Sequence, residues 1–432
     1  MRLWPPASTL LSLAGSASNR TASSRLDGRT YSNAGGFTGL YCIRRLRFSR
    51  SLTLSSALFL CALTLRPQII GVAPLFPLIQ QDLHLPHTVV GLLGTVPVLC
   101  MGVFAPLAPF LRHRLRTLPA ITASLALIAL FGLTRSLTPG ALVLVLLTFG
   151  VGAGIGLGGA LLPVAVKEQF PDQSVRTSGI YASGIQLGST ISAAAAVPLA
   201  IALGGWRSAL LAFSLATAAL TIAWVGLTRS ASTEAAANAR PRFAFNNPIA
   251  WRLALAFALF GIFYYGLSAW LTAAYVARGW SLPQAAGLVA VVNAGSLVGS
   301  VLLPVFARRI ASRSRTGAMM AATLVVASLG IAAVPALAFL WAGLAGLANG
   351  ALFPLIIALP VEASEQPDEV GAISGVMLGA GYTLAAIAPS GFGAIRDLTG
   401  SFTPILWLIV VAAVLLLATS LSFDGIRRPR YY

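Results

Sequence analysis

Charged side chains are scarce in this sequence, where Asp, Glu, Lys and Arg together make up 9% of 432 residues. Soluble proteins carry about 25% charged residues. Hydrophobic residues make up 57% of the chain, and the mean hydropathy is +0.84. These values exclude a water-soluble enzyme and a disordered chain. The net charge of +18 would indicate nucleic-acid binding only on a basic face of a soluble fold, so we expect no nucleic-acid partner.

Cysteine and histidine are equally scarce, with three of each in the whole chain. Cys42, Cys61 and Cys100 are odd in number and include no Cys-x-x-Cys pair, which excludes a disulfide framework. His84 and His87 lie three residues apart but have a proline between them and no acidic or sulfur cluster beside them. The metal-ligand spacings that zinc sites use are therefore missing, and we expect neither a metal nor a cofactor.

Long apolar stretches dominate the chain from Leu52 onward. A membrane-crossing helix needs about 20 mostly apolar residues. Twelve segments satisfy this: 53–79, 88–111, 118–135, 140–165, 177–203, 207–227, 250–276, 284–307, 317–334, 336–360, 371–395 and 402–422. Only Pro335 marks the break between the ninth and the tenth. The pattern predicts an all-α membrane protein with twelve transmembrane helices.

Arginine and lysine are unevenly distributed between the two sets of loops. Beyond residue 50, the loops on the side of the two termini carry 16 cations. The opposite loops carry four, namely Arg135, Arg207, Arg278 and Arg396. Because cytoplasmic loops are enriched in Lys and Arg, this bias predicts a multi-pass protein of the cell (inner) membrane with both termini in the cytoplasm.

The chain divides into five parts by composition. Residues 1–50, with eight Arg and one Asp, read as a basic disordered cytoplasmic extension or as upstream sequence translated from a wrongly chosen start. A six-helix half follows at 51–227, then a polar cytoplasmic linker at 228–249 and a second six-helix half at 250–423. Residues 424–432 form a short basic tail.

The two halves resemble each other in sequence. Residues 159–163 read Gly-Ala-Leu-Leu-Pro, and residues 350–354, offset by 191, read Gly-Ala-Leu-Phe-Pro. At the same offset Gly184, Gly188 and Pro198 match Gly375, Gly379 and Pro389. Matches in order between spans of the same orientation indicate a parallel duplication of six plus six helices, the arrangement of the major facilitator halves.

Arg66 is the only formal charge that we expect deep within a span, about 20 Å into the first at 1.5 Å per residue. An arginine at mid-membrane costs at least about 2.5–3.5 kcal/mol and must find a partner or a wet cavity. The sequence offers no buried Asp or Glu as that partner. The guanidinium therefore binds an anionic substrate through its planar fork, or it caps the backbone carbonyls that Pro67 leaves without donors.

The residues around Arg66 resemble a known family. The run TLRPQIIGVAPLFPLIQQDLHL, which starts at Thr64, and the run ISGVMLGAGYTLAAIAPSGFGAIRDLTGSF, which starts at Ile373, are similar to the cyanate/2-nitroimidazole transporter (CynX/NimT-like) family of the major facilitator superfamily. The resemblance covers residues 55–405. It implies two pseudo-symmetric six-helix halves, a central cavity between them and alternating access, with Arg66 at the Arg of the family's Asn-Leu-Arg-Pro element.

The chain departs from that family where amides are expected. Thr64 replaces the Asn of the element, and Gly159, Phe260 and Leu378 stand where the family carries amides. The resemblance thus implies a cavity that has lost most of its amide donors and kept its cation, so cyanate is not transferred as the substrate. Three amides remain within the spans, and we expect them to form interhelical hydrogen bonds: Gln186, Asn293 and Asn349.

Aromatic residues of the seventh and eleventh spans are further candidates for the cavity. Tyr264, Tyr265, Trp270 and Tyr382 combine a ring with one polar group and could line a binding site. They could equally pack the bundle or lie at the membrane interface. By resemblance Tyr265 and Tyr382 match family positions. The predicted substrate site comprises Arg66, Thr64, Tyr265, Trp270 and Tyr382.

These features predict a secondary transporter that moves a small anionic or weakly polar solute by alternating access. An efflux carrier for apolar, drug-like compounds is the alternative. A membrane-embedded enzyme is a weaker alternative because the sequence shows no catalytic set of residues. A sensor is also weaker because no segment after residue 50 is long enough for a soluble output domain. The acids lie at span ends or in loops, and Asp82 is the nearest candidate for proton coupling, against a plain surface Asp. We expect the protein to bind a small-molecule substrate, to lie in a lipid bilayer and to be a monomer.

Overall fold

Residues 52–229, 244–309, 312–364 and 366–426 are described by the structure, a computed structural model of the chain. The chain separates into two units, Met1–Arg50 and Ser51–Tyr432, and the fold described below belongs to the second. The basic extension predicted at residues 1–50 lies outside the described residues. So do most of the predicted linker and most of the predicted C-terminal tail.

The described residues form helices joined by short loops. A helix over residues 52–64 comes first. The elements that follow are α2 (Pro67–Ile70), η2 (Ala73–Leu75), α3 (Phe76–Leu83), α4 (His87–Phe104), η3 (Ala105–Leu107), α5 (Ala108–Leu115), α6 (Thr117–Ser136), α7 (Ala141–Gln169), η4 (Pro171–Gln173), α8 (Ser174–Ala202), α9 (Trp206–Thr228), α10 (Pro248–Val276), α11 (Leu282–Arg309), α12 (Arg313–Ala333), η5 (Pro335–Leu337), α13 (Ala338–Ala363), α14 (Pro367–Ala385), α15 (Ile387–Thr399), α16 (Thr403–Ser420) and η6 (Phe423–Ile426).

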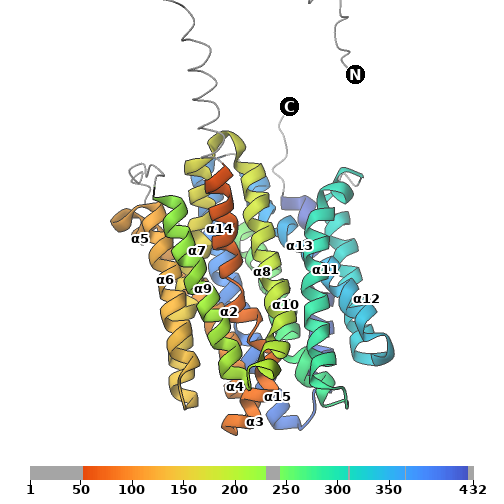
Figure 1. Cartoon of the computed structure of the whole chain (residues 1–432). Helices are drawn as coiled ribbons and strands as arrows, with labels where there is room; N and C mark the ends of the chain where they lie inside the picture. Colours follow the sequence, from red (N-terminus) through yellow and green to blue (C-terminus); the bar gives the residue numbers. More distant parts are fainter. Residues whose placement is uncertain (1–51, 230–243, 310–311, 365, 427–432) are drawn as a thin grey trace, which may run out of the picture. The chain divides into compact units, whose positions relative to one another are not determined.

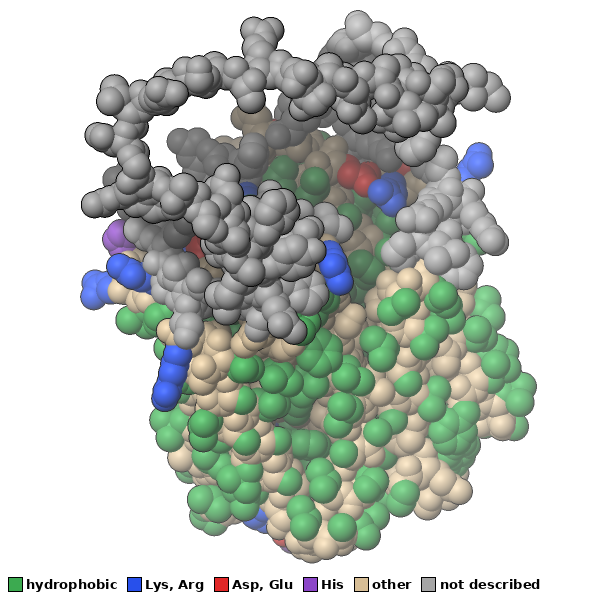
Figure 2. All heavy atoms as spheres, turned by 45° about the horizontal axis from the view of Figure 1, so that its top comes forward, with side chains coloured by type: hydrophobic (Ala, Val, Ile, Leu, Met, Phe, Trp, Pro, Cys, Tyr) green, Lys and Arg blue, Asp and Glu red, His purple; other side chains and the backbone are tan. Residues whose placement is uncertain are grey.

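Twelve helical segments in the described part of the chain are long and apolar enough to cross a membrane, which confirms the predicted number of spans. The ninth and tenth, Arg313–Ala333 and Pro335–Ala363, meet at the break that Pro335 predicted. Large apolar side chains such as Leu142 and Ile222 are well exposed on the outside of the bundle. Figure 2 shows flanks covered by hydrophobic side chains, with Lys and Arg gathered mainly toward one end. Such a surface suits lipid rather than water.

Helices that precede and follow the predicted linker pack directly against each other. Within the first part α6 lies against α7 and α9, and within the second α12 lies against α13 and α16. Between the parts, α8 packs along α11 (Figure 1), and α4 packs against α14 and α15. The helices α14 and α15 together form the eleventh span. Because α4 packs against both, the contacts between the two parts extend along much of the length of α4.

The first span is interrupted near its middle. The helix over residues 52–64 ends before Leu65 and Arg66, and α2 begins at Pro67. Proline has no N–H to donate and suits the first position of a helix, so a new helix starts there. The Arg66 carbonyl accepts the first hydrogen bond of α2, from the Ile70 amide at 2.9 Å. Arg66 therefore occupies a helix break inside the bundle.

Glycines allow α11 and α13 to approach until their backbones touch. A methyl group added at Gly346 or Gly350 would overlap a backbone carbonyl of α11, that of Val292 or Ser296. A methyl group at Gly299 would overlap the Leu347 carbonyl of α13. Small residues at such crossings let transmembrane helices pack closely, and the contact holds two helices of the same half together.

We expect Gly350→Ala to destabilise the folded protein by about 1–3 kcal/mol, the usual cost of overpacking a tight core. The obstacle is the Ser296 backbone, which cannot rotate away as a side chain could. Gly371→Ala is the matched control, because a methyl group at Gly371 would meet nothing within 4 Å. Thermal unfolding in detergent should show a lowered midpoint for Gly350→Ala alone. Equal midpoints for the two variants would contradict this account of the α11–α13 crossing.

Candidate functional site

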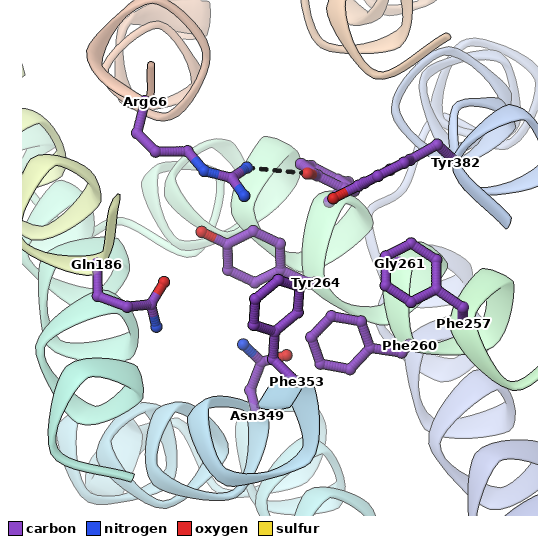
Figure 3. Close-up of a pocket in the computed structure, with 10 residues that line it drawn as sticks. Arg66, Gln186, Phe257, Phe260, Gly261, Tyr264, Asn349, Phe353 and Tyr382 are labelled. Carbon is purple, nitrogen blue, oxygen red and sulfur yellow. Dashed lines mark hydrogen bonds between the residues drawn. The ribbon is translucent and has the colours of Figure 1, made fainter. Parts of the chain in front are cut away.

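A pocket lies where the break in the first span faces α8, α10, α13 and α14. It is lined by Arg66, Gln186, Phe257, Phe260, Gly261, Tyr264, Tyr265, Asn349, Phe353 and Tyr382. The empty space between these residues, including the part open to solvent, is about 410 Å³, and only a small fraction of it could hold the centre of a water molecule. Figure 3 shows Arg66 on one side of this space and Asn349 on the opposite side.

Arg66 is 8% exposed, and its guanidinium points into the pocket. Its Nη1 donates a hydrogen bond to the Tyr265 hydroxyl at 3.0 Å (Figure 3). Among the hydrogen bonds of the described residues, none joins this side chain to a backbone carbonyl. Of the two interpretations that the sequence left open, the geometry therefore favours a guanidinium available to a ligand over a helix cap.

The ion pairs and backbone contacts of carboxylates among the described side chains lie away from Arg66. The ion pairs of these residues are His87–Asp397, Arg112–Glu168, Arg207–Asp82 and Arg313–Glu362. Asp424 accepts hydrogen bonds from the Arg313 and Ser314 amides. The recorded partner of Arg66 is a neutral phenol, so its positive charge is not balanced by a carboxylate of the described chain. A buried cation in that state favours an anion in the adjoining space.

Three tyrosines surround the guanidinium, and all are buried or nearly so. The rings of Tyr264 and Tyr265 meet edge to face at 5.1 Å, and Tyr382 meets Phe257 in the same way at 4.8 Å. The Tyr264 hydroxyl donates to Asn293 Oδ1 at 2.9 Å. The structure thus brings together three of the five residues predicted for the site, Arg66, Tyr265 and Tyr382.

The other two predicted residues lie outside the lining of the pocket. Thr64 is buried, and its hydroxyl donates to the Cys61 carbonyl of its own helix at 2.6 Å. Trp270 is also buried, and its indole N–H donates to the Pro389 carbonyl at 2.8 Å. Its ring packs against Phe76, at 5.6 Å between centroids. Trp270 therefore braces α10 against α15 rather than facing the space beside Arg66.

Arg135, which the sequence assigns to a loop, is a second buried arginine, near the end of α6 and 1% exposed. Its Nη2 donates to the backbone carbonyl and to Oε1 of Gln68, at 2.9 and 2.7 Å, and Nη1 donates to Thr148 at 3.3 Å. The position of Arg135 one residue before the end of α6 suggested a loop. These neutral acceptors solvate its charge, and because Gln68 follows Arg66 by two residues, Arg135 holds the broken segment in place.

Asp82 lies at the end of α3 and is paired with Arg207, while Trp206 donates to the same carboxylate oxygen at 3.2 Å. Its side chain is 46% exposed, which fits the plain surface interpretation. We expect Asp82→Asn to leave the rate of solute uptake within about twofold of wild type, because exposed ion pairs contribute little. Uptake with and without an imposed proton gradient checks this. Loss of gradient-driven uptake with retained exchange would identify Asp82 as a coupling residue.

A polar contact joins α4 to α15 at the end of the bundle where α4 begins. The Asp397 carboxylate accepts hydrogen bonds from the His87 and Thr88 amides at 2.9 and 2.8 Å. It also contacts the Thr88 hydroxyl and the His87 ring, each at 2.7 Å. The backbones are close here, since a methyl group at Gly393 would lie 2.5 Å from the His87 carbonyl. A carboxylate at a helix N-terminus is stabilised by its free N–H groups, so Asp397 closes this end.

The fold and the site define a multi-pass membrane transporter: the described residues form twelve spans, and the pocket they line holds a cation that no described carboxylate pairs with. The family is equally plain. A sequence model of the Major Facilitator Superfamily matches residues 54–389, and the chain belongs to that superfamily. It is thus a secondary transporter built of two six-helix halves that moves a small solute by alternating access.

Known proteins similar to this chain are transporters. The 2-nitroimidazole transporter of Escherichia coli (strain K12) is 28% identical over 388 residues, covering 89% of this chain and 97% of the relative. The cyanate transport protein CynX of the same organism is 29% identical, covering 87% and 98%. Among solved structures, a bacterial homolog to human lysosomal transporter Spinster, inward-facing and occupied, has a TM-score of 0.68, 17% identity and coverage of 88% and 98%. That last likeness concerns the fold alone.

The sequence did not single out most of the pocket lining. Gln186 and Asn349 were expected only to bond neighbouring helices, and Phe260 was noted only as the replacement of an amide. All three line the pocket. The signal that could have found Asn349 is the repeat, because it directly precedes the segment at 350–354 that matches 159–163. No comparable pattern marks Gln186.

Proposed function

We propose that this transporter carries a small anion across the cell (inner) membrane and binds it at Arg66, with Tyr265 and Tyr382 beside it. The single observation behind the proposal is the buried guanidinium that lines the pocket with a neutral phenol as its recorded partner. A planar fork of N–H donors suits carboxylate-like groups. The relative named for cyanate, itself a small anion, supports the same class of solute.

We also propose the orientation and the division of the chain that the sequence predicts. Both termini lie in the cytoplasm, the halves comprise residues 51–227 and 250–423, and residues 228–249 link them. The excess of Lys and Arg on one set of loops supports this, and it remains large after Arg135 is removed from the opposite set. On this orientation the contact between Asp397 and the start of α4 closes the outer end.

A second candidate function is export of small apolar compounds. Phe257, Phe260 and Phe353 form one wall of the pocket, and their rings lie close together, with Phe260 and Phe353 at 5.8 Å between centroids. An apolar wall of this kind suits a flat ring as well as an ion. The relative named for 2-nitroimidazole, a flat heterocycle, supports this second candidate.

The two candidates differ in the charge of the solute, and uptake into proteoliposomes separates them. Radiolabelled furan-3-carboxylate should enter vesicles that contain the wild-type protein faster than empty vesicles. Unlabelled cyanate should compete, and furan-3-carboxamide, which has a similar shape and no charge, should not. Competition by the carboxamide and by apolar heterocycles, without competition by either anion, would favour the second candidate and overturn the first.

A further inference from the structure

Asn349 on α13 contributes a buried acceptor to the same pocket. The residue is 4% exposed and lines the space opposite Arg66 (Figure 3). Its Nδ2 donates to Ser296 Oγ at 3.3 Å. Its Oδ1 is buried and has no hydrogen-bond partner among the described residues. Buried polar atoms are nearly always paired, so one without a partner requires an explanation.

The hydrogen bonds of Ser296 favour one orientation of the Asn349 amide. A serine hydroxyl carries one proton, and the Val292 and Gly346 carbonyls are its acceptors here, at 2.9 and 3.1 Å. With the proton on either carbonyl, Oγ accepts toward Asn349, which places the NH₂ group beside it and the oxygen away from Ser296. Turning the amide over would require the Ser296 hydroxyl to leave both carbonyls and donate to Asn349 Oδ1 instead.

Asn293 on α11 is a nearby amide whose oxygen and nitrogen both have hydrogen-bond partners. Its Oδ1 accepts from the Tyr264 hydroxyl at 2.9 Å, and its Nδ2 donates to the Val289 carbonyl at 2.8 Å. The expected role of an interhelical hydrogen bond describes Asn293 fully. It describes only the NH₂ side of Asn349, whose oxygen is left for a donor that the described chain does not provide.

Aromatic rings line the space between Arg66 and Asn349. Phe260 and Tyr264 are nearly parallel, with 10° between their planes, and Phe353 lies beside Phe260. Ring faces accept the faces or edges of other flat conjugated groups. The pocket therefore presents a cation on one side, aromatic walls, and a hydrogen-bond acceptor on the other side.

We propose that the solute is a flat, conjugated anion that carries an N–H or O–H on the edge remote from its negative charge. Arg66 receives the charge, the aromatic walls receive the ring, and Asn349 Oδ1 accepts the hydrogen bond from the far edge. This inference rests on the proposed function, in which Arg66 binds the anion. It adds Asn349 as the residue that selects among anions of similar size.

Binding of two nearly isosteric acids to the purified full-length protein tests the proposal. Pyrrole-3-carboxylate carries a ring N–H where furan-3-carboxylate carries an oxygen. A site that leaves a buried polar group unpaired with one of two ligands discriminates strongly between them. We expect the wild-type protein to bind the pyrrole about tenfold more tightly, as measured by calorimetry. Equal affinity for the two acids would overturn the role of Asn349.

Two variants locate the preference within the pocket. Asn349→Leu replaces the amide by an apolar side chain of similar shape and leaves no orphan acceptor, so it should fold and bind both acids with a ratio near one. Gln186→Leu removes the other amide that lines the pocket; it can change the affinity for both acids alike, but it should keep the tenfold ratio between them. A preference that survives Asn349→Leu, or disappears in Gln186→Leu, contradicts the assignment.

An uncharged pair separates this inference from the proposed function. Pyrrole-3-carbonitrile and furan-3-carbonitrile differ by the same N–H but bear no charge. If neither acid binds while the pyrrole nitrile binds more tightly than the furan nitrile, the anion proposal fails and the role of Asn349 stands. If both acids bind equally and Arg66→Gln abolishes their binding, the anion proposal stands and the role of Asn349 fails.

Discussion

Replacing Arg66 by Gln is expected to lower the uptake of a small anion such as furan-3-carboxylate by about 100-fold. A charge-assisted hydrogen bond contributes about 1.5–3 kcal/mol, and a bidentate one contributes more. The guanidinium is buried and donates to the Tyr265 hydroxyl, so the variant loses the cation that, among the described residues, lines the pocket. Initial rates in proteoliposomes, normalised to the amount of protein inserted, provide the measurement.

Three further variants separate loss of the charge from loss of the fold. Arg66→Lys keeps the charge without the planar fork and should retain part of the activity. Tyr265→Phe removes only the neutral partner of Arg66 and should change uptake a few-fold. Arg135→Gln removes the second buried arginine, which holds Gln68 and does not line the pocket, so it should reduce stability while the folded protein keeps its affinity. A folded Arg66→Gln variant that takes up the anion at the wild-type rate would contradict the anion hypothesis.

Replacing Asp397 by Ala is expected to open the end of the bundle where α4 begins. The carboxylate interacts with both His87 and Thr88 of α4, through their backbone amides and their side chains. Alternating access requires that this contact break when the pocket faces that side. Loss of the carboxylate should shift the equilibrium toward the open state by at least about tenfold, which corresponds to 1.4 kcal/mol.

Labelling of an introduced cysteine measures that shift. Ser390 lies on α15 seven residues before Asp397, along the same interface with α4, where its amide donates to the Thr95 hydroxyl at 3.1 Å. In a background without the native cysteines, Ser390→Cys should react about tenfold faster with an impermeant maleimide when Asp397→Ala is also present.

Asp424 provides the matched control for Asp397. Its carboxylate accepts from the Arg313 and Ser314 amides at the start of α12, at 2.8 and 3.1 Å. It therefore also sits at a helix N-terminus, but both partners belong to the second half of the chain. Asp424→Ala should leave the labelling rate at Ser390→Cys unchanged. If both substitutions accelerate labelling equally, the effect is a general loosening and not the release of a closure between the halves.

The number and order of the spans could be predicted because apolar length alone specifies a membrane helix. Even the weak break at Pro335 follows from a residue that is favoured at the start of a helix and removes a hydrogen bond within one. Arg66 stood out for a similar reason, since a charge far from any span end has few explanations. These predictions depend on local chemistry, which the sequence shows directly.

The composition of the pocket could not be predicted in the same way. In a helix that is apolar on all sides, hydrophobic periodicity does not tell which face meets the pocket, so the pattern along α10 did not separate Trp270 from Tyr265. Arg135 looked like a loop residue because its partners, Gln68 and Thr148, lie far away in the sequence. Asn349 became informative only when its distant neighbour Ser296 showed that one amide oxygen has no partner.

The most direct test of the central claim, that Arg66 receives a negative charge, is equilibrium binding of furan-3-carboxylate and furan-3-carboxamide to purified wild-type protein and to Arg66→Gln. The account predicts that the wild-type protein prefers the carboxylate and that the variant loses this preference or reverses it in favour of the carboxamide. If the wild-type protein binds the two ligands equally, or the variant keeps the preference for the carboxylate, the claim is wrong.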